Sequence, residues 1–361
     1  MKKFLTGLVA GILLAILTGV IVFFATLRLG ERRPTVTDGS TLVLALDGDI
    51  PEQAPVELPL PIPFLEQHTP VTVEETWLTL RQAAGDPRIK AAVLLPSGLD
   101  AGWAKLEEIH DDLAAFKKSG KPLYAFLRNP GAREYYLASV ADRIFMTPTD
   151  MLDVKGLRVE MMFVEETLKK IGVEMEVEHV GKFKDAGDMF TRTSMTPETR
   201  EVMNAILDQY YGDLVQTIAA GRKKSPAAVR ALIDNGPFPG REALAGGLVD
   251  SLGFEDRMYD ELQQRLHEDK IRKISNRDYR KAADASHGGE SARRIALVVG
   301  QGAILRGPAQ EMQDDAITSG GMIKLLRQVE DDPGIRGVIL RIDSPGGDGV
   351  ASDDILHEVE Q

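Results

Sequence analysis

The sequence contains an internal repeat, which limits the folds that the chain can adopt. Residues 332–340 repeat the residue types of 86–94, and residues 295–304 repeat those of 42–50. A helical pattern follows each pair in the same order. Recurrence of order, spacing and residue type is typical of a duplicated domain.

Within each copy, strands are expected to alternate with helices. Apolar runs at 42–46, 91–95 and 143–146 are bounded by turn residues, as buried strands are. Helical patterns cover roughly 76–84 and 104–118. This alternation predicts an α/β domain.

The middle of the chain gives further expectations. A helix is expected over 163–171, and the alternating residues 173–180 predict a strand. Thr196 and Ser225 each precede a proline and predict helix starts, because proline is tolerated at the first helical position. The polar segment 272–293 predicts an interdomain linker.

The amino-terminal segment predicts a membrane anchor. Residues 4–26 carry no charge and are rich in Leu, Val, Ile, Ala and Gly. About 20 apolar residues let a helix cross a bilayer, whereas a cleaved signal peptide has a shorter apolar region. We therefore expect one transmembrane helix, with cleavage as the alternative. Two lysines precede it and three arginines follow it, so charge leaves the orientation open.

Composition argues against several classes of function. The net charge of -12 disfavours a nucleic-acid partner, because phosphates are held by clustered basic residues. Without cysteine the chain has no disulfides and no thiolate nucleophile. The six histidines are scattered, so no metal site is expected.

The chemistry-bearing motif is Asp343-Ser344-Pro345-Gly346-Gly347, at the carboxyl end of an expected buried strand. Ligand sites of open α/β sheets lie at such ends. Paired glycines let a backbone approach a substrate closely, and free N–H groups can stabilise an oxyanion. A tight structural turn without chemistry is the alternative.

Residues 338–347 resemble the SPGG signature of the ClpP/crotonase-like superfamily. The tandem copies, the anchor and Gly247-Leu248-Val249-Asp250 narrow the resemblance to the long, duplicated form of signal peptide peptidase (protease IV). It implies ClpP/crotonase-like repeated ββα units in a tandem duplicated domain, preceded by one transmembrane helix. It also implies an oxyanion hole at Gly347, with Gly346 beside it.

Members of this family use a serine–lysine dyad. The segment Gly181-Lys182-Phe183-Lys184-Asp185-Ala186 matches the family's lysine context, which implies that Lys184 is the general base. Lysine titrates near 10.4 in water, so a lysine base must be desolvated. Asp185 should then point away. Lys182 is the reserve candidate, on the same face of an expected extended segment, and two solvated surface lysines are the alternative.

No nucleophile is expected in this chain. Ala132 stands where the first copy would carry the family's serine, and residues 94–98 lack the paired glycines. We interpret three serines as structural: Ser97, Ser139 and Ser344. The second copy stops inside its first helix, so we expect the serine beyond Gln361 and an inactive chain alone.

The expected organisation is an anchor over 1–33, a first peptidase-like copy carrying the lysine over 40–271, the linker, and the truncated start of a second copy over 294–361. The resemblance implies a membrane-bound serine endopeptidase that degrades cleaved signal peptides and needs no cofactor. It implies a homo-oligomer, a tetramer, in the inner (cytoplasmic) membrane with its bulk on the periplasmic side.

Two other function classes stay open. A non-catalytic membrane scaffold of degenerate copies is one. An acyl-CoA enzyme of the crotonase type is the other, and the membrane anchor disfavours it.

Overall fold

The computed structural model describes residues 34–54, 70–284, 294–308 and 316–361, together with a few positions between 11 and 19. The expected transmembrane helix over 4–26 therefore lies almost wholly outside the described residues. No described helix is both long and apolar enough to cross a bilayer.

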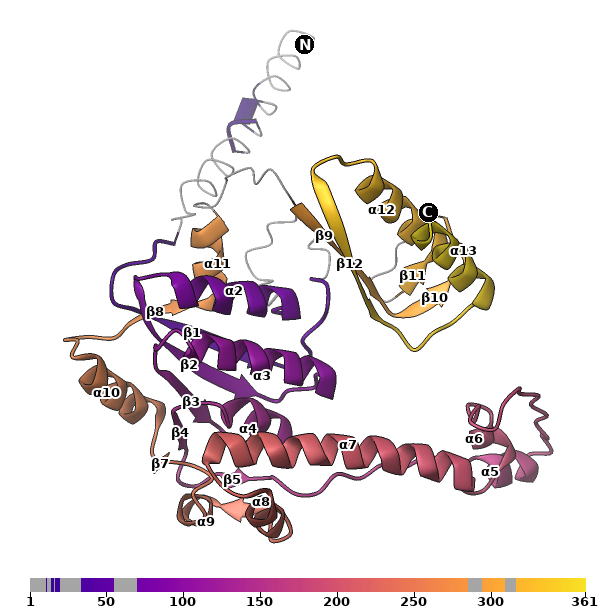
Figure 1. Ribbon diagram of the computed structural model, residues 1–361, viewed down its shortest axis with the longest axis horizontal. Helices are drawn as coiled ribbons and strands as arrows, with labels where there is room; N and C mark the ends of the chain where they lie inside the picture. The colour runs from indigo at the N-terminus through magenta and orange to yellow at the C-terminus, as the bar shows by residue number, and fades with distance from the viewer. Residues whose placement is uncertain are drawn as a thin grey trace.

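A six-stranded parallel sheet forms the centre of the first unit, which confirms the α/β prediction (Figure 1). Its strand order is β7-β4-β3-β2-β1-β8. The apolar runs of the sequence form the inner strands, because both faces of a parallel sheet are covered. The strands are β1 (Ser40–Asp47), β2 (Ile89–Ser97), β3 (Leu123–Leu127), β4 (Arg143–Met146), β7 (Ser251–Leu252) and β8 (Arg272–Ser275).

Helices cover both faces of this sheet (Figure 1). The larger core lies between one face and four helices, and it includes Leu44, Leu113 and Tyr135. The smaller core lies on the other face, where Met258 and Leu262 of α10 (Glu255–Leu266) pack on the strands. The four helices are α2 (Val73–Gly85), α3 (Trp103–Lys117), α4 (Ala132–Ala138) and the carboxyl-terminal part of α7 (Pro197–Arg222).

The expected linker over 272–293 is wrong in its first part. β8 pairs with β1 at the edge of the sheet, and α11 (Asn276–Asp284) follows it. An edge strand needs only one apolar face, and α11 packs on the first unit through the buried residues Asn276 and Tyr279. Polar composition therefore concealed two elements of the first unit.

A projecting arm leaves the body of the first unit (Figure 1). The helix α7 has 26 residues and is about 39 Å long at 1.5 Å per residue. Apart from Thr199, its buried residues lie between Leu214 and Ala219, so most of it extends outward. Two short helices, α5 (Glu165–Lys170) and α6 (Asp188–Thr191), lie at its far end.

The strand expected over 173–180 does not form. All eight residues are exposed and outside any described strand, and alternation alone provides no ladder partner. The helix expected over 163–171 exists as the shorter α5.

Both helix starts expected before prolines are confirmed. Thr196 caps α7, and its hydroxyl accepts the Thr199 N–H. Ser225 caps α8 (Pro226–Ile233), and its hydroxyl accepts the Ala228 N–H. The remaining elements of this unit are β5 (Met151–Leu152), β6 (Phe238–Pro239) and α9 (Gly240–Ala245).

The second unit begins with the parallel pair β9 (Arg294–Gln301) and β12 (Ile335–Asp343). Two helices pack on this pair around a small core that includes Val298, Met322 and Ile355. Its other elements are β10 (Ala303–Leu305), β11 (Ala316–Thr318), α12 (Ser319–Glu330) and α13 (Gly349–Val359).

The β9–β12 pair has the same register as the β1–β2 pair. In each strand pair, the register shifts by one residue after the first two paired residues. Seven further residue pairs then follow without interruption to the strand ends. The turns before the second strands also agree, since Asp86 and Asp332 each accept the backbone N–H two residues later. The repeated sequence thus adopts a repeated backbone geometry at this point.

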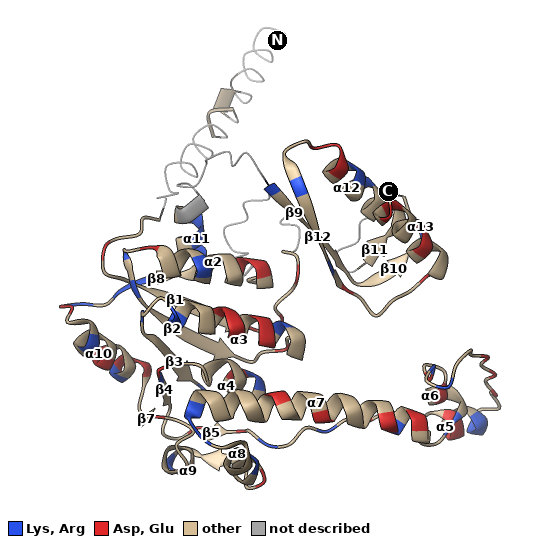
Figure 2. Ribbon diagram, in the orientation of Figure 1, with Lys and Arg blue, Asp and Glu red and all other residues tan. Residues whose placement is uncertain are grey.

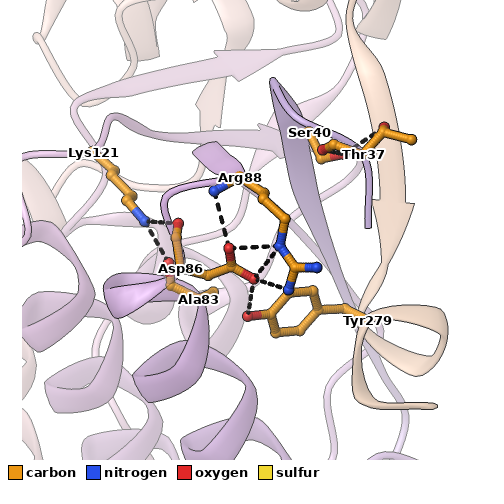
Figure 3. A network of polar contacts seen from close by, with 7 residues as sticks. All are labelled: Thr37, Ser40, Ala83, Asp86, Arg88, Lys121 and Tyr279. Carbon is orange, nitrogen blue, oxygen red and sulfur yellow. Dashed lines mark hydrogen bonds and ion pairs between the residues drawn. The ribbon is translucent and has the colours of Figure 1, made fainter. Parts of the chain in front are cut away.

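A network around Asp86 fastens α11 to the sheet (Figure 3). Arg88 donates to the Asp86 carboxylate from its backbone and its guanidinium, and the Tyr279 hydroxyl donates at 3.1 Å. Lys121 donates to the Ala83 and Asp86 carbonyls. The hydrogen bonds from Arg88 lower the pKa of Asp86 from 3.8 to about 2.

Replacing Asp86 by Asn is expected to lower the free energy of unfolding at pH 7 by about 2 kcal/mol, a value typical of hydrogen bonds to a charged group. Because folding depresses this pKa, the stabilisation is present above about pH 4 and is lost as the pH falls towards 2. Denaturant titrations across this range should show a shallower pH dependence for Asp86→Asn. The exposed Asp100→Asn is the control, and equal curves for both variants would contradict this role.

Candidate active site

The turn that follows β12 has the geometry expected of a glycine-paired loop. β12 ends at Asp343, and α13 begins at Gly349. The Gly346 N–H donates to the Ser344 hydroxyl at 3.0 Å, and Gly346 has φ +94°. Glycine is required there because side chains rarely adopt this backbone conformation.

Gly347 lies against the backbone of Ile304 in β10. A Cβ atom at this position would approach the Ile304 carbonyl oxygen to 2.1 Å, so no larger residue fits. The Ile304 N–H donates to the Gly346 carbonyl at 3.0 Å, and the Asp348 N–H donates to the Ile304 carbonyl at 2.8 Å. Among the described residues the Gly347 N–H has no hydrogen-bond acceptor, and Gly347 is exposed. A free N–H at this point can stabilise an oxyanion.

Lys184 lies elsewhere, at the far end of the arm, where its side chain is exposed. Its N–H donates to the Gly181 carbonyl at 3.3 Å, and Gly181 has φ +96°, so the segment is a turn and not a strand. No described hydrogen bond or ion pair joins this turn to Gly346 or Gly347. The structure therefore does not bring the two halves of the expected site together, and the described residues leave the Lys184 amine in water.

Lys182 and Lys184 do not share a strand face, because the segment is not extended. The Lys182 ammonium lies over the Phe183 ring, 4.5 Å from its centroid. None of the described ion pairs joins Asp185 to either lysine. The geometry gives Lys182 no advantage as a base.

In the first unit, a carboxylate occupies the turn that corresponds to the one after β12. The Glu134 side chain is buried and accepts the Leu99 N–H at 2.6 Å and the Gly131 N–H at 2.9 Å. Ala132, at the position of the expected serine, begins α4 and carries no nucleophile. The buried Ser139 hydroxyl donates to the Tyr136 carbonyl.

A charged cluster between the two units was missed at the level of sequence. Arg341 of β12 donates to Glu52 at 2.9 Å and to Glu108 of α3 at 3.1 Å. Lys105 of α3 lies 2.9 Å from Asp343. One signal existed: Arg341 directly follows the apolar run 338–340 of this strand, and such a charge needs a partner when the strand is covered.

Comparison with known proteins identifies the family. Residues 115–269 match the model of peptidase family S49. A chloroplastic serine protease SPPA of Arabidopsis thaliana is 30% identical over 335 residues, covering 90% of this chain and 47% of that protein. Residues 115–269 belong to peptidase family S49.

Bacterial relatives of this chain are similar over comparable lengths. Protease 4 of Haemophilus influenzae is 28% identical over 350 residues, covering 92% of this chain and 56% of that protein. Protease 4 of Salmonella typhi is 30% identical over 293 residues, covering 78% of this chain and 46% of that protein. The chain thus spans about half the length of these curated relatives.

Gly347→Ala is expected to displace β10 from the turn, because the new methyl group would overlap the Ile304 carbonyl. The expected loss of stability in the second unit is about 1–3 kcal/mol, typical of overpacking. Hydrogen exchange at the Ile304 and Asp348 amides measures it. Gly349→Ala is the matched control, since open space surrounds Gly349; unchanged protection in Gly347→Ala would refute the close approach.

Proposed function

We propose that this chain supplies the lysine base and the oxyanion turn of a membrane-bound serine endopeptidase that degrades cleaved signal peptides. The observation that carries the proposal is the Gly347 N–H, which has no acceptor among the described residues, on a glycine-paired turn of a chain whose residues 115–269 match peptidase family S49. The proposed mechanism is acyl transfer through a serine–lysine dyad.

In the proposed reaction the serine hydroxyl attacks the peptide carbonyl while Lys184, as the neutral amine, takes its proton. The carbonyl oxygen gains the negative charge and accepts a hydrogen bond from Gly347. Collapse of this intermediate breaks the C–N bond, and the ammonium returns the proton to the leaving amine. Water then attacks the acyl ester by the same route and releases the second product with the free serine.

We place the serine outside these 361 residues, on a longer polypeptide. The relatives, about twice as long, support this placement. The open side of β12 also supports it: β2 pairs with β3 through Ala92–Leu94, whereas the corresponding residues of β12 have no second partner among the described strands. Ile295 and Ile339 on this pair are more than half exposed.

Lys184 can act as a base only if another surface covers it. The arm has the composition of such an interface, because a series of apolar side chains on and near it is exposed. They are Val159, Met162, Ile171, Val173, Met175, Val177, Val180, Phe183 and Ile206. Exposed apolar patches of this extent mark interaction surfaces. We propose that they are covered in a homo-oligomer, a tetramer, which also desolvates the amine.

The proposed location is the inner membrane, with residues 4–26 as a single anchor and the bulk on the periplasmic side. The long uncharged run of the sequence supports the anchor. Signal peptides left in a bilayer after cleavage would be within reach of an enzyme tethered in this way.

A non-catalytic scaffold is the second candidate, favoured by the exposed Lys184 and by the occupied turn at Glu134. No described feature favours the acyl-CoA enzyme.

The proposed function requires a serine in the continuing reading frame. We expect a Ser-Gly-Gly-Tyr-like loop roughly 30–50 residues beyond Gln361, from the spacing of the repeat. The longer polypeptide should hydrolyse an apolar signal-like peptide, and replacing that serine by Ala should lower turnover by more than about a thousandfold. Alanine at this position in the natural sequence, or hydrolysis by the purified 361-residue chain, would contradict the proposal.

Introducing a single charged residue on the arm tests whether the arm forms the proposed oligomer interface. Val180 is 93% exposed, and Val180→Asp should weaken association of the longer polypeptide because the interface would bury an unpaired carboxylate. Sedimentation velocity measures the change. Phe254→Asp is the control, since Phe254 is 61% exposed on the far side of the first sheet; equal behaviour of the two variants would exclude the arm as the interface.

A further inference from the structure

Two aspartates flank the glycine turn, and each is paired with a cation from another element. Asp343, which ends β12, meets the Lys105 ammonium of α3 at 2.9 Å. Asp348, which caps α13, meets the Arg306 guanidinium at 2.9 Å. The hydrogen bond from the Ala351 N–H and the contact with Arg306 lower the pKa of Asp348. Each carboxylate thus has a cationic partner beside the turn.

The Lys105–Asp343 pair differs from the other because it crosses between the two units. Lys105 belongs to the first unit, and its side chain is 14% exposed. It also lies 3.9 Å from Glu52, whose side chain is 4% exposed. Buried charges are stable only when paired, so this lysine is held in place from both sides.

Further contacts fix the same boundary. Arg341, two residues before Asp343, donates to Glu52 and Glu108 of the first unit. The Glu52 N–H donates to the Gln301 side chain at 3.1 Å, and Gln301 is the partner of Asp343 in the strand register. The end of β12 is therefore positioned by the first unit, whose helix α3 carries several acidic residues (Figure 2).

The position of Asp343 determines where the turn begins. Ser344 follows it directly and accepts the Gly346 N–H, so a shift of Asp343 would displace the glycines. The charge of the Asp343 carboxylate also affects the proposed reaction. An unpaired carboxylate near Gly347 would repel the negative charge that forms on the substrate oxygen, and water screens this repulsion in part because the Asp343 side chain is 48% exposed.

We propose that Lys105 is a positioning residue for the oxyanion turn. This lysine of the first unit pairs with Asp343 of the second unit, holds that carboxylate in place and neutralises the carboxylate's charge near Gly347. The inference rests on the proposed function for its catalytic consequence. The claim that Lys105 holds the turn in place concerns only these 361 residues and does not depend on peptidase activity.

The catalytic test compares three variants of the longer polypeptide. Lys105→Met leaves Asp343 unpaired and should lower kcat roughly tenfold with little change in KM, because the effect falls on the transition state. Adding Asp343→Asn removes the uncompensated charge and should restore most of kcat. Lys155→Met is the matched control, since Lys155 pairs with Asp153 at 2.9 Å away from the turn. A double variant as slow as Lys105→Met would overturn the charge role, because a purely structural ion pair is absent from both.

The structural test uses the 361-residue chain and no activity. Hydrogen exchange of the Gly346 and Asp348 amides, which are hydrogen-bonded in this turn, should accelerate in Lys105→Met and stay unchanged in Lys155→Met. Unchanged exchange in both would refute the positioning role even if the peptidase is active. If the longer polypeptide has no peptidase activity, the proposed function fails, and this exchange measurement alone still decides whether Lys105 positions the turn.

Discussion

The parallel register of β1 with β2, and of β9 with β12, is the constraint on which the rest of the structure depends. Parallel pairing places the carboxyl ends of neighbouring strands at one edge of a sheet, so the segments that follow them meet there. In the second unit this brings Ile304 against Gly347, and in the first it lets the Asp100 N–H after β2 donate to the Gly48 carbonyl after β1. The parallel β2–β3 pair brings Leu99 to Glu134 in the same way. The same backbone arrangement thus yields one open turn and one turn filled by a carboxylate.

The two units are joined where their strands end. Glu52 follows β1 and accepts Arg341 of β12, while α3 contributes Lys105 and Glu108. The Glu52 carboxylate and the Lys105 ammonium are largely buried, so a displacement that leaves either of them unpaired is costly and one arrangement is favoured. The first unit thereby acts on the turn of the second. Its arm, in contrast, holds Lys184 in water and needs another surface.

Much of the fold followed from the sequence because its signals are local. Continuous apolar runs predicted the inner strands, and residues before prolines predicted the starts of α7 and α8. The strand over 173–180 failed because alternation does not supply a partner, and β8 was missed because an edge strand can be polar. The glycine turn was predicted as a motif, and the structure supplied the reason for each glycine.

What the sequence could not predict depends on contacts between distant residues. Glu52 and Arg341 are separated by 289 positions, and nothing near either residue indicates the other. The exposure of Lys184 was equally hidden, since the family resemblance implied a role for this amine without stating which surface covers it.

The most direct test of the account is the turnover of the longer polypeptide with Lys184→Ala and, separately, Lys182→Ala. If Lys184 is the base, its replacement should abolish peptide hydrolysis, whereas the Lys182 variant should retain it and both should remain folded. Full activity in Lys184→Ala, or loss confined to Lys182→Ala, would contradict the assignment of the base and with it the proposed mechanism.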